Sequence, residues 1–470
     1  MTSGQGPEKS EDVVLPFTVH DDTQMPDPPK PEDDSDEVFQ STADGVEFRT
    51  VGWFRASILF LKVVFAVGVL SLPTTLSTLG AVGGTLCVFG FGVFNTYCFV
   101  IVGNFRERHR GCHSIADTAG VVGGPICREI AGILFIIGNL LGTSSAIIGL
   151  GTAFNALSYH AICTVAWNVI SAVIIALPAA MRRFQDIGWV TYVGFVSIYA
   201  AVLIVVIGVT QRDRPAAAPP TGDFELGFSA IKEPTFAAGM VAASTIFYSS
   251  SGTSAFLPIM SEMRNPKDYK KALYLCMIVV NASYIAFSMV MYKWAGKWIA
   301  DPSLGSAGQT IKMVAYGVGL PGLIASGCIF LHVSSKYVFV RILRNSVHLQ
   351  KPTIVHWISW LGSVSGIVTL AWVFAEVIPI FSYVLSLVGS VCYAPLAMML
   401  PGWLWLYDHG HYRRGGFYRA IIYWLHWLLL PLGGLFFVGA TYGVVLQINE
   451  AYTDGTVGGV FSCADNSNST

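Results

Sequence analysis

Apolar segments long enough to cross a lipid bilayer dominate this chain from residue 55 onward. A membrane-spanning helix needs about 20 consecutive, mostly apolar residues, and the chain contains eleven such segments. We expect spans at residues 55–78, 83–103, 125–157, 161–181, 187–209, 236–260, 272–296, 310–344, 355–374, 377–400 and 420–446. The pattern therefore predicts an all-α polytopic membrane protein with eleven transmembrane helices.

Two of these segments are interrupted by residues that break helices. The segment at residues 58–79 contains Gly68 and Pro73, and the segment at residues 236–260 contains a Ser-Ser-Ser-Gly run at 249–252. Unwound backbone in lipid leaves N–H and C=O groups unsatisfied, at a cost of several kcal/mol each. A pair of such interruptions, one in each half of the chain, indicates the substrate site of a transporter. The alternative is that Gly68 and Pro73 merely kink a packed helix.

The spacing of these features predicts an internal repeat. The interruptions fall in the first and sixth segments, and the third and eighth segments are unusually long. Features that recur five segments apart indicate two five-helix repeats, and because five is odd the second repeat must be inverted. We divide the chain into a disordered acidic tail (1–50), a first repeat (51–210), a loop (211–235), a second repeat (236–400), a loop with the eleventh helix (401–446) and a C-terminal tail (447–470).

Composition agrees with a membrane protein and excludes other classes. Charged residues make up 12% of the chain and hydrophobic residues 53%, which excludes an ordinary soluble protein. Lys and Arg are scattered through short loops instead of forming a basic face, so we expect no nucleic-acid partner. The nine cysteines show no CxxC or metal-ligand spacing, and we expect no disulfide framework and no metal.

The distribution of basic residues predicts the orientation in the membrane. Alternate loops are rich in Lys and Arg, for example at 106–110 and 264–271, and the positive-inside rule makes this set cytoplasmic. The N-terminus is then cytoplasmic and the C-terminus extracellular or luminal. We expect the plasma membrane, with the vacuolar membrane as an alternative. The acidic tail at 1–50 could bind trafficking or ubiquitination machinery.

Two motifs at the interruptions resemble those of a known family. Residues 62–73 read Lys-Val-Val-Phe-Ala-Val-Gly-Val-Leu-Ser-Leu-Pro, which is similar to the Gly-x-Gly-[Ile/Val]-Leu-x-Leu-Pro signature of the amino acid/auxin permease family. Residues 247–252, followed by Glu-Met-Arg-Asn-Pro at 262–266, resemble the sixth-helix motif of that family. The resemblance extends over residues 50 to 450, with fungal neutral amino acid permeases as the nearest likeness. It implies a leucine-transporter-like fold and coupled uptake of amino acids. The first Gly of the signature is Ala66 here.

An interrupted helix offers partners for both charges of an amino acid. Backbone N–H groups near 69–72 could bind the carboxylate, helped by the dipole of the second half-helix, and carbonyl groups near 64–67 could hold the ammonium group or a cation. No acidic residue lies at mid-depth beside either interruption, so a neutral amino acid fits better than a cationic one. Our substrate-binding candidates are Ala66, Gly68, Val69, Leu70, Asn139, Thr143, Phe247, Ser250, Ser251 and Gly252.

The coupling ion is less well determined by the residues. The resemblance implies a sodium site formed by a hydroxyl pair on the eighth helix and carbonyl groups of the first helix, and Ser334, Ser335 and Val67 occupy those positions. The serines could instead hydrogen-bond to carbonyl groups one turn earlier in their own helix. His332 could bind a proton or simply pack, and Lys336 could supply a charge or extend to the cytoplasmic side.

Lys62 and Glu376 raise the same question as Lys336, because both are charged and lie in apolar segments. The analogy with fungal relatives favours a proton, and sodium stays open. We expect no cofactor.

These observations predict a secondary transporter that imports neutral amino acids by alternating access, driven by proton symport. An amino acid sensor or receptor on a transporter scaffold is the alternative from another class. A sodium-coupled transporter or a vacuolar exporter of the same fold also stays open. We expect no enzyme, because no nucleophile–base, metal-ligand or paired-carboxylate arrangement lies at one depth.

Overall fold

The structure is a computed structural model whose described part is almost entirely helical. It describes residues 51–65, 67–112, 114–181, 184–252, 256–257, 259–260, 262–343, 346–349, 353–455 and 459–467. The tail at 1–50 and the site candidate Ala66 lie outside these residues. Within them, the β-structure consists of one isolated parallel bridge between Val51 and Met263. The predicted all-α class is confirmed.

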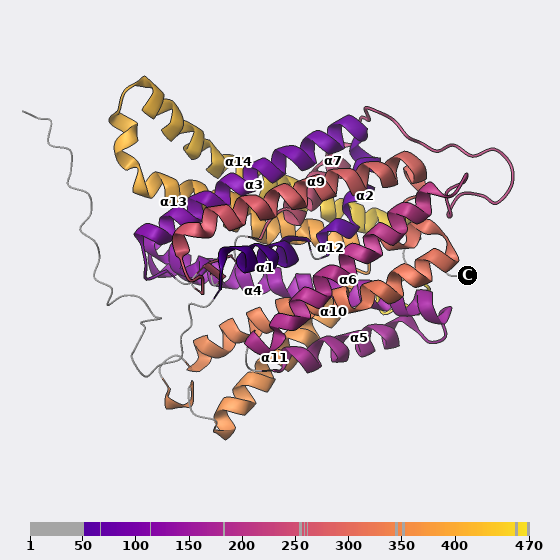
Figure 1. The fold of residues 1–470 in the computed structure, drawn as a ribbon, viewed down its shortest axis with the longest axis horizontal. Coiled ribbons are helices and arrows are strands. Elements are labelled where there is room, and N and C mark those ends of the chain that lie inside the picture. The colour runs from indigo at the N-terminus through magenta and orange to yellow at the C-terminus, as the bar shows by residue number, and fades with distance from the viewer. Residues whose placement is uncertain are drawn as a thin grey trace, which may run out of the picture.

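Eight helical segments among the described residues are long and apolar enough to cross a membrane. They are α3 (Ala81–Arg108), α4 (Ile115–Ser158), α6 (Phe184–Thr210), α9 (Tyr269–Ala295), α10 (Gln309–Leu343), α11 (Ile354–Val377), the continuous run of α12 (Phe381–Leu387), a π-helix (Val388–Met399) and α13 (Leu400–Asp408), and α14 (Phe417–Thr453). Two shorter apolar helices are α5 (Thr164–Ala179) and α7 (Phe236–Ser249). The count of eleven spans stays a prediction. The long helices run side by side across Figure 1.

Both predicted interruptions are present. The first span consists of α1 (Trp53–Phe65), a 3₁₀ turn (Gly68–Leu70) and α2 (Leu72–Leu79), in which Pro73 occupies the first turn, where a missing N–H costs no hydrogen bond. The sixth span begins with α7, which ends at Ser249, and residues 250–252 are not helical.

The longest helices differ in their bounds from the predicted spans. α4 has 44 residues and contains a non-helical residue, Gly124 (φ 73°, ψ −169°), followed by Pro125. The predicted span began at this kink, whereas α4 begins ten residues earlier, where the Ser114 hydroxyl oxygen accepts a hydrogen bond from Asp117 N at 3.2 Å. α10 has 35 residues, as its pattern predicts, and α14 has 37, longer than the predicted 420–446.

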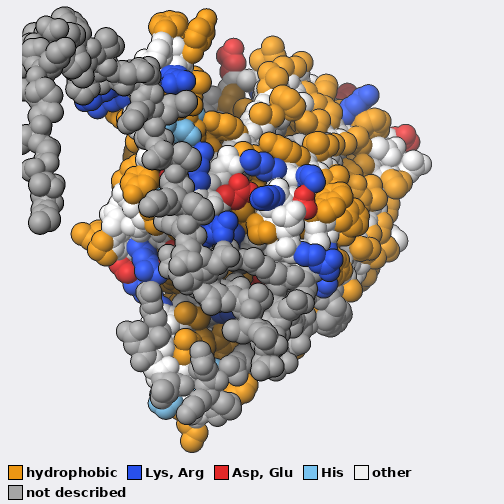
Figure 2. All heavy atoms as spheres, turned by 60° about the vertical axis from the view of Figure 1, so that its left-hand side comes forward, with side chains coloured by type: hydrophobic (Ala, Val, Ile, Leu, Met, Phe, Trp, Pro, Cys, Tyr) orange, Lys and Arg blue, Asp and Glu red, His pale blue; other side chains and the backbone are white. Residues whose placement is uncertain are grey.

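One end of the bundle is rich in arginine. The last turns of α3 and α10 carry Arg106, Arg108 and Arg341, and a 3₁₀ turn between α13 and α14 carries Arg413 and Arg414. We call this the basic end. Figure 2 views it and shows Lys and Arg side chains gathered there, beside a broad hydrophobic surface. The described C-terminal segment lies at the opposite end (Figure 1).

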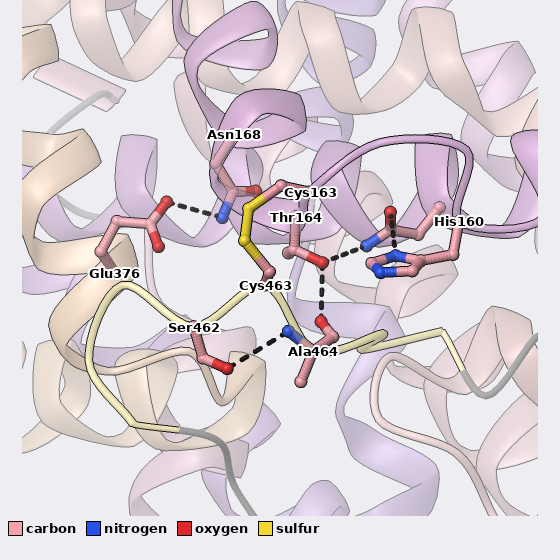
Figure 3. The surroundings of a disulfide bond; sticks show 9 residues. His160, Cys163, Thr164, Asn168, Glu376, Ser462, Cys463 and Ala464 are labelled. Carbon is pink, nitrogen blue, oxygen red and sulfur yellow. Dashed lines mark hydrogen bonds between the residues drawn. A yellow bond between two sulfur atoms is a disulfide. The ribbon is translucent and has the colours of Figure 1, made fainter.

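One disulfide bond corrects the expectation that the cysteines form no framework. Cys163, just before α5, is bonded to Cys463 in the C-terminal segment, 300 residues later (Figure 3). Thr164 Oγ1 donates a hydrogen bond to Ala464 O at 2.7 Å, and Asn155 Nδ2 donates to Asn466 Oδ1 at 2.9 Å. The C-terminal segment is thereby fastened to α4 and α5. Sequence spacing could not show this, because only the fold brings such distant residues together.

Candidate functional site

The two interrupted spans contact each other where they unwind. Ser249 Oγ lies 3.2 Å from Gly68 O and 2.7 Å from Thr245 O of its own helix, and both carbonyl groups compete for its single proton. A Cβ atom at Gly68 would lie 2.8 Å from Ser249 Cα, which is closer than real Cβ contacts allow. Glycine at this position therefore permits the close approach of two backbones. The chain just before the first span is also joined to the chain just after the sixth span, because Val51 N donates a hydrogen bond to Glu262 O at 3.1 Å.

A cavity lies beside this contact. It is partly open to solvent. The lining residues come from α1 and the first interruption, α4, the end of α7, α10 and the π-helix: Lys62, Val63, Val64, Val67, Gly68, Asn139, Tyr248, Ser249, Ser251, Ser326, Ile329, Phe330, Val333 and Tyr393. Main-chain groups, hydroxyl groups and apolar side chains thus surround the space, as is typical of small-molecule sites.

Four of the predicted site residues line this cavity. Gly68, Asn139 and Ser251 are substrate-binding candidates, and Val67 is a cation candidate. They come from three different spans, so the fold brings together residues that are far apart in the sequence.

The remaining described candidates at the first interruption and on α4 are buried away from the lining. Val69 and Leu70 are buried in the 3₁₀ turn. Leu70 N donates to Val67 O and Ser71 N donates to Gly68 O, each at 3.2 Å, so these two amides are used within the turn. Thr143 Oγ1 donates to Asn139 O at 2.9 Å within α4.

The other candidates of the sixth span lie outside the cavity lining and pack against neighbouring helices or the first span. The ring of Phe247 packs against Phe91 and Phe436, with centroid distances of 5.6 Å to each. Ser250 Oγ accepts a 2.7 Å hydrogen bond from Asn95 Nδ2 on α3. A Cβ atom at Gly252 would lie 3.0 Å from Val64 Cγ2, so this residue also packs closely on the first span.

The candidates for ion coupling on α10 lie outside the cavity lining. Ser334 Oγ donates to Phe330 O at 2.8 Å, which is the back-bonded alternative for this hydroxyl group. Ser335 Oγ is buried and has no hydrogen-bond partner among the described residues. His332 Nδ1 lies 3.1 Å from Ala179 O, and its ring packs edge-on against Trp360. Lys336 is exposed.

Lys62 is the charged residue of the cavity. It is fully buried on α1, and its Nζ donates hydrogen bonds to Ser326 Oγ at 2.8 Å and to Gly322 O at 3.2 Å, both on α10. A Cβ atom at Gly194 on α6 would lie 3.2 Å from Lys62 Cε, so the lysine stem fills a seam between α6 and α10. No ion pair of Lys62 with a described acidic residue is present. The sequence shows that Lys62 is unusual, because it is a lysine in an apolar span. The position of its ammonium group depends on the small residues of α6 and α10 that leave room for the side chain.

An acidic residue lies just beyond the sixth span. Burial raises the pKa of the Glu262 carboxyl group above its ordinary value, and the positive charge of Lys336 acts in the opposite direction. Glu376, the other charged candidate, lies near the end of α11 and accepts a hydrogen bond from Asn168 Nδ2 at 3.0 Å (Figure 3). Glu376 is therefore placed beside the disulfide and not in the cavity.

Spanning helices around a cavity at two touching interruptions define a membrane transporter. Residues 49–446 match the family described as transmembrane amino acid transporter protein, and the chain belongs to this family.

Relatives of similar length agree with this assignment. The chain is 45% identical over 461 residues to a protein named transmembrane transporter from Gibberella moniliformis, covering 98% of this chain and 96% of that protein. It is 29% identical over 434 residues to the N amino acid transport system protein of Neurospora crassa, covering 89% of each chain.

Solved structures confirm the predicted leucine-transporter-like fold. A Na⁺-coupled sialic acid symporter in a substrate-bound outward-open state matches with a TM-score of 0.54 and 11% identity, covering 87% of this chain and 92% of that one. The inward-facing conformation of Mhp1 matches with a TM-score of 0.51 and 16% identity, covering 90% and 94%. At these identities the likeness concerns the fold alone.

Proposed function

We propose that this protein imports neutral amino acids by alternating access and that a proton gradient drives the import. The neutral class is supported by the lining of the cavity, which includes Lys62 but, among the described residues, no Asp or Glu. A substrate with a cationic side chain would meet the lysine without a counter-ion. The apolar side chains of Ile329, Phe330 and Val333 suit an uncharged substrate side chain.

The position of Lys62 is the observation that supports proton coupling. Its ammonium group contacts a carbonyl oxygen and a hydroxyl oxygen of α10, ligands of the kind that a metal cation would need. A charged lysine inside the membrane is costly and is commonly part of an ion or proton pathway. A side chain that gains and loses a proton as the cavity opens to either side would link the proton gradient to substrate movement.

The two ends of the bundle support an orientation. Arginine residues gather at the basic end, which the positive-inside rule assigns to the cytoplasm. The Cys163–Cys463 disulfide lies at the opposite end, and disulfides persist in oxidising compartments. We therefore place the C-terminal segment outside the cell, in a plasma-membrane protein, and the N-terminal tail in the cytoplasm.

Uptake by the purified protein in liposomes tests this proposal. Radiolabelled neutral, cationic and acidic amino acids are offered under a proton gradient or a sodium gradient applied separately. We expect neutral amino acids to accumulate under the proton gradient alone. Accumulation that requires sodium, or a preference for charged amino acids, would contradict the proposal.

A lysine substitution sharpens the test. Lys62→Met should abolish accumulation driven by the proton gradient. Lys312→Met is the matched control, because Lys312 is a buried lysine on α10 whose Nζ donates instead to Ser467 O, at 2.9 Å. Loss of coupling in both variants would show that any buried lysine matters, and would contradict a specific role for Lys62.

A further inference from the structure

A tyrosine on α9 contacts both interrupted spans through a single hydroxyl group. The side chain of Tyr284 is 1% exposed. Its Oη lies 2.8 Å from Val64 O and 2.9 Å from Ser249 O. Val64 is in the last turn of α1, and Ser249 is the last residue of α7. The hydroxyl group therefore meets the carbonyl ends of the two half-helices that precede the interruptions.

Carbonyl groups at these positions need a donor. The last four carbonyl groups of a helix have no partner within the helix, and in the membrane each unsatisfied group is costly. A tyrosine hydroxyl has one proton, so it donates to one carbonyl at a time while both compete for it. Both acceptors can be served only while the two half-helix ends stay close to this one oxygen atom.

Asn95 also donates hydrogen bonds at an interruption, but both of these bonds go to the same span. Asn95 Nδ2 donates to Phe247 O at 3.2 Å and to Ser250 Oγ, which are both on the sixth span. Tyr284, by contrast, lies outside both spans and contacts one carbonyl group of each. The ring of Phe65 stacks on Tyr284 with a centroid distance of 5.5 Å, which fixes the direction of the hydroxyl group.

We propose that Tyr284 is a positioning residue that holds the two interruptions in register, so that both present their main-chain groups to the substrate together. The inference rests on the proposed function. Val64 and Ser249 line the cavity, so a shift of either half-helix end changes the walls of the site. Tyr284 is absent from that lining and acts through the backbone that it holds.

Tyr284→Phe removes the hydroxyl group and keeps the ring. Losing a buried hydrogen bond and leaving two carbonyl groups without a donor should raise the KM for a neutral amino acid about tenfold, with a much smaller change in the maximal rate. Tyr269→Phe is the matched control, because Tyr269 is also buried on α9 but donates to Phe99 O at 3.2 Å, away from the interruptions. Its KM should match that of the wild type.

The outcomes separate this inference from the proposed function. An unchanged KM in Tyr284→Phe, or an equal rise in Tyr269→Phe, overturns the positioning role while wild-type transport stands. Absence of neutral amino acid uptake by the wild type overturns the proposed function and this inference with it. If Tyr284→Phe does not fold, Phe65→Leu tests the same contact, because it keeps the Tyr284 hydroxyl group and removes the stacked ring that directs it; a raised KM supports the role and an unchanged KM overturns it.

Discussion

Ser249 Oγ lies within hydrogen-bond distance of Gly68 O, so the two interruptions of this chain, which lie 181 residues apart, meet at one point. Each interruption exposes main-chain groups that a lipid environment would not tolerate alone. Their contact beside a cavity gives those groups neighbours and access to a ligand. The proposed substrate site of this amino acid transporter family member is therefore built from backbone as much as from side chains.

Substitution of Gly68 should damage transport. In Gly68→Ala the new Cβ would lie 2.8 Å from Ser249 Cα, which is backbone and cannot rotate away, so the spans must separate. We expect uptake to fall by about tenfold or more, as for a site displaced by roughly 1 Å. Gly90→Ala on α3 is the control, because its new methyl group would meet no neighbouring group within 4 Å, and it should transport normally. Normal uptake by Gly68→Ala would contradict the close contact.

Helix-breaking residues in the sequence predict the interruptions, but the sequence does not predict which groups a long side chain contacts. Gly68, Pro73 and the serine run mark the positions where helices cannot continue, and the structure has breaks there. Lys62 could be recognised as unusual, but its hydrogen bonds depend on Gly194 and Gly322, where α6 and α10 approach closely.

The same distinction holds for pairings over long range. The Cys163–Cys463 bond joins residues that no local pattern connects. Ser334 is a second example, because the family resemblance implies an ion ligand on the eighth helix, and only the structure shows that this hydroxyl group donates to Phe330 O of its own helix. Sequence patterns therefore do not predict the contacts that form only when the helices pack into a bundle.

Loss of the disulfide should destabilise the protein without changing its substrate. Cys163→Ser and Cys463→Ser each release the C-terminal segment from α5, at a cost on the order of 2–4 kcal/mol. Because both remove the same bond, the double variant should have the same melting temperature as either single variant. Cys127→Ser, at a free cysteine, is the control. Thermal unfolding in detergent measures all four, and additive losses would argue against the bond.

The pH dependence of stability should report the buried carboxyl group of Glu262. Its raised pKa means that the folded protein holds this proton more tightly than the unfolded chain does. The associated stability is present at low pH and is lost as the pH rises through the folded-state pKa.

Relative to Glu262→Gln, the wild type should therefore lose melting temperature as the pH rises from the ordinary pKa of a glutamate carboxyl group towards the higher folded-state pKa. Lys336→Met should steepen that loss, because Lys336 lowers the same pKa. A difference between wild type and Glu262→Gln that does not vary with pH would show that Glu262 is not perturbed in this way.

The most direct test of the central claim is substrate protection at Ser251, which lines the cavity beside the second interruption. Ser251→Cys is made in a background with Cys87 and Cys127 replaced by serine, because both are free and partly exposed. Asp223→Cys in the exposed loop is the control. A neutral amino acid should slow the reaction of a thiol reagent with Ser251→Cys and leave the control unchanged. Equal rates of modification with and without substrate would contradict a binding site at the two interruptions.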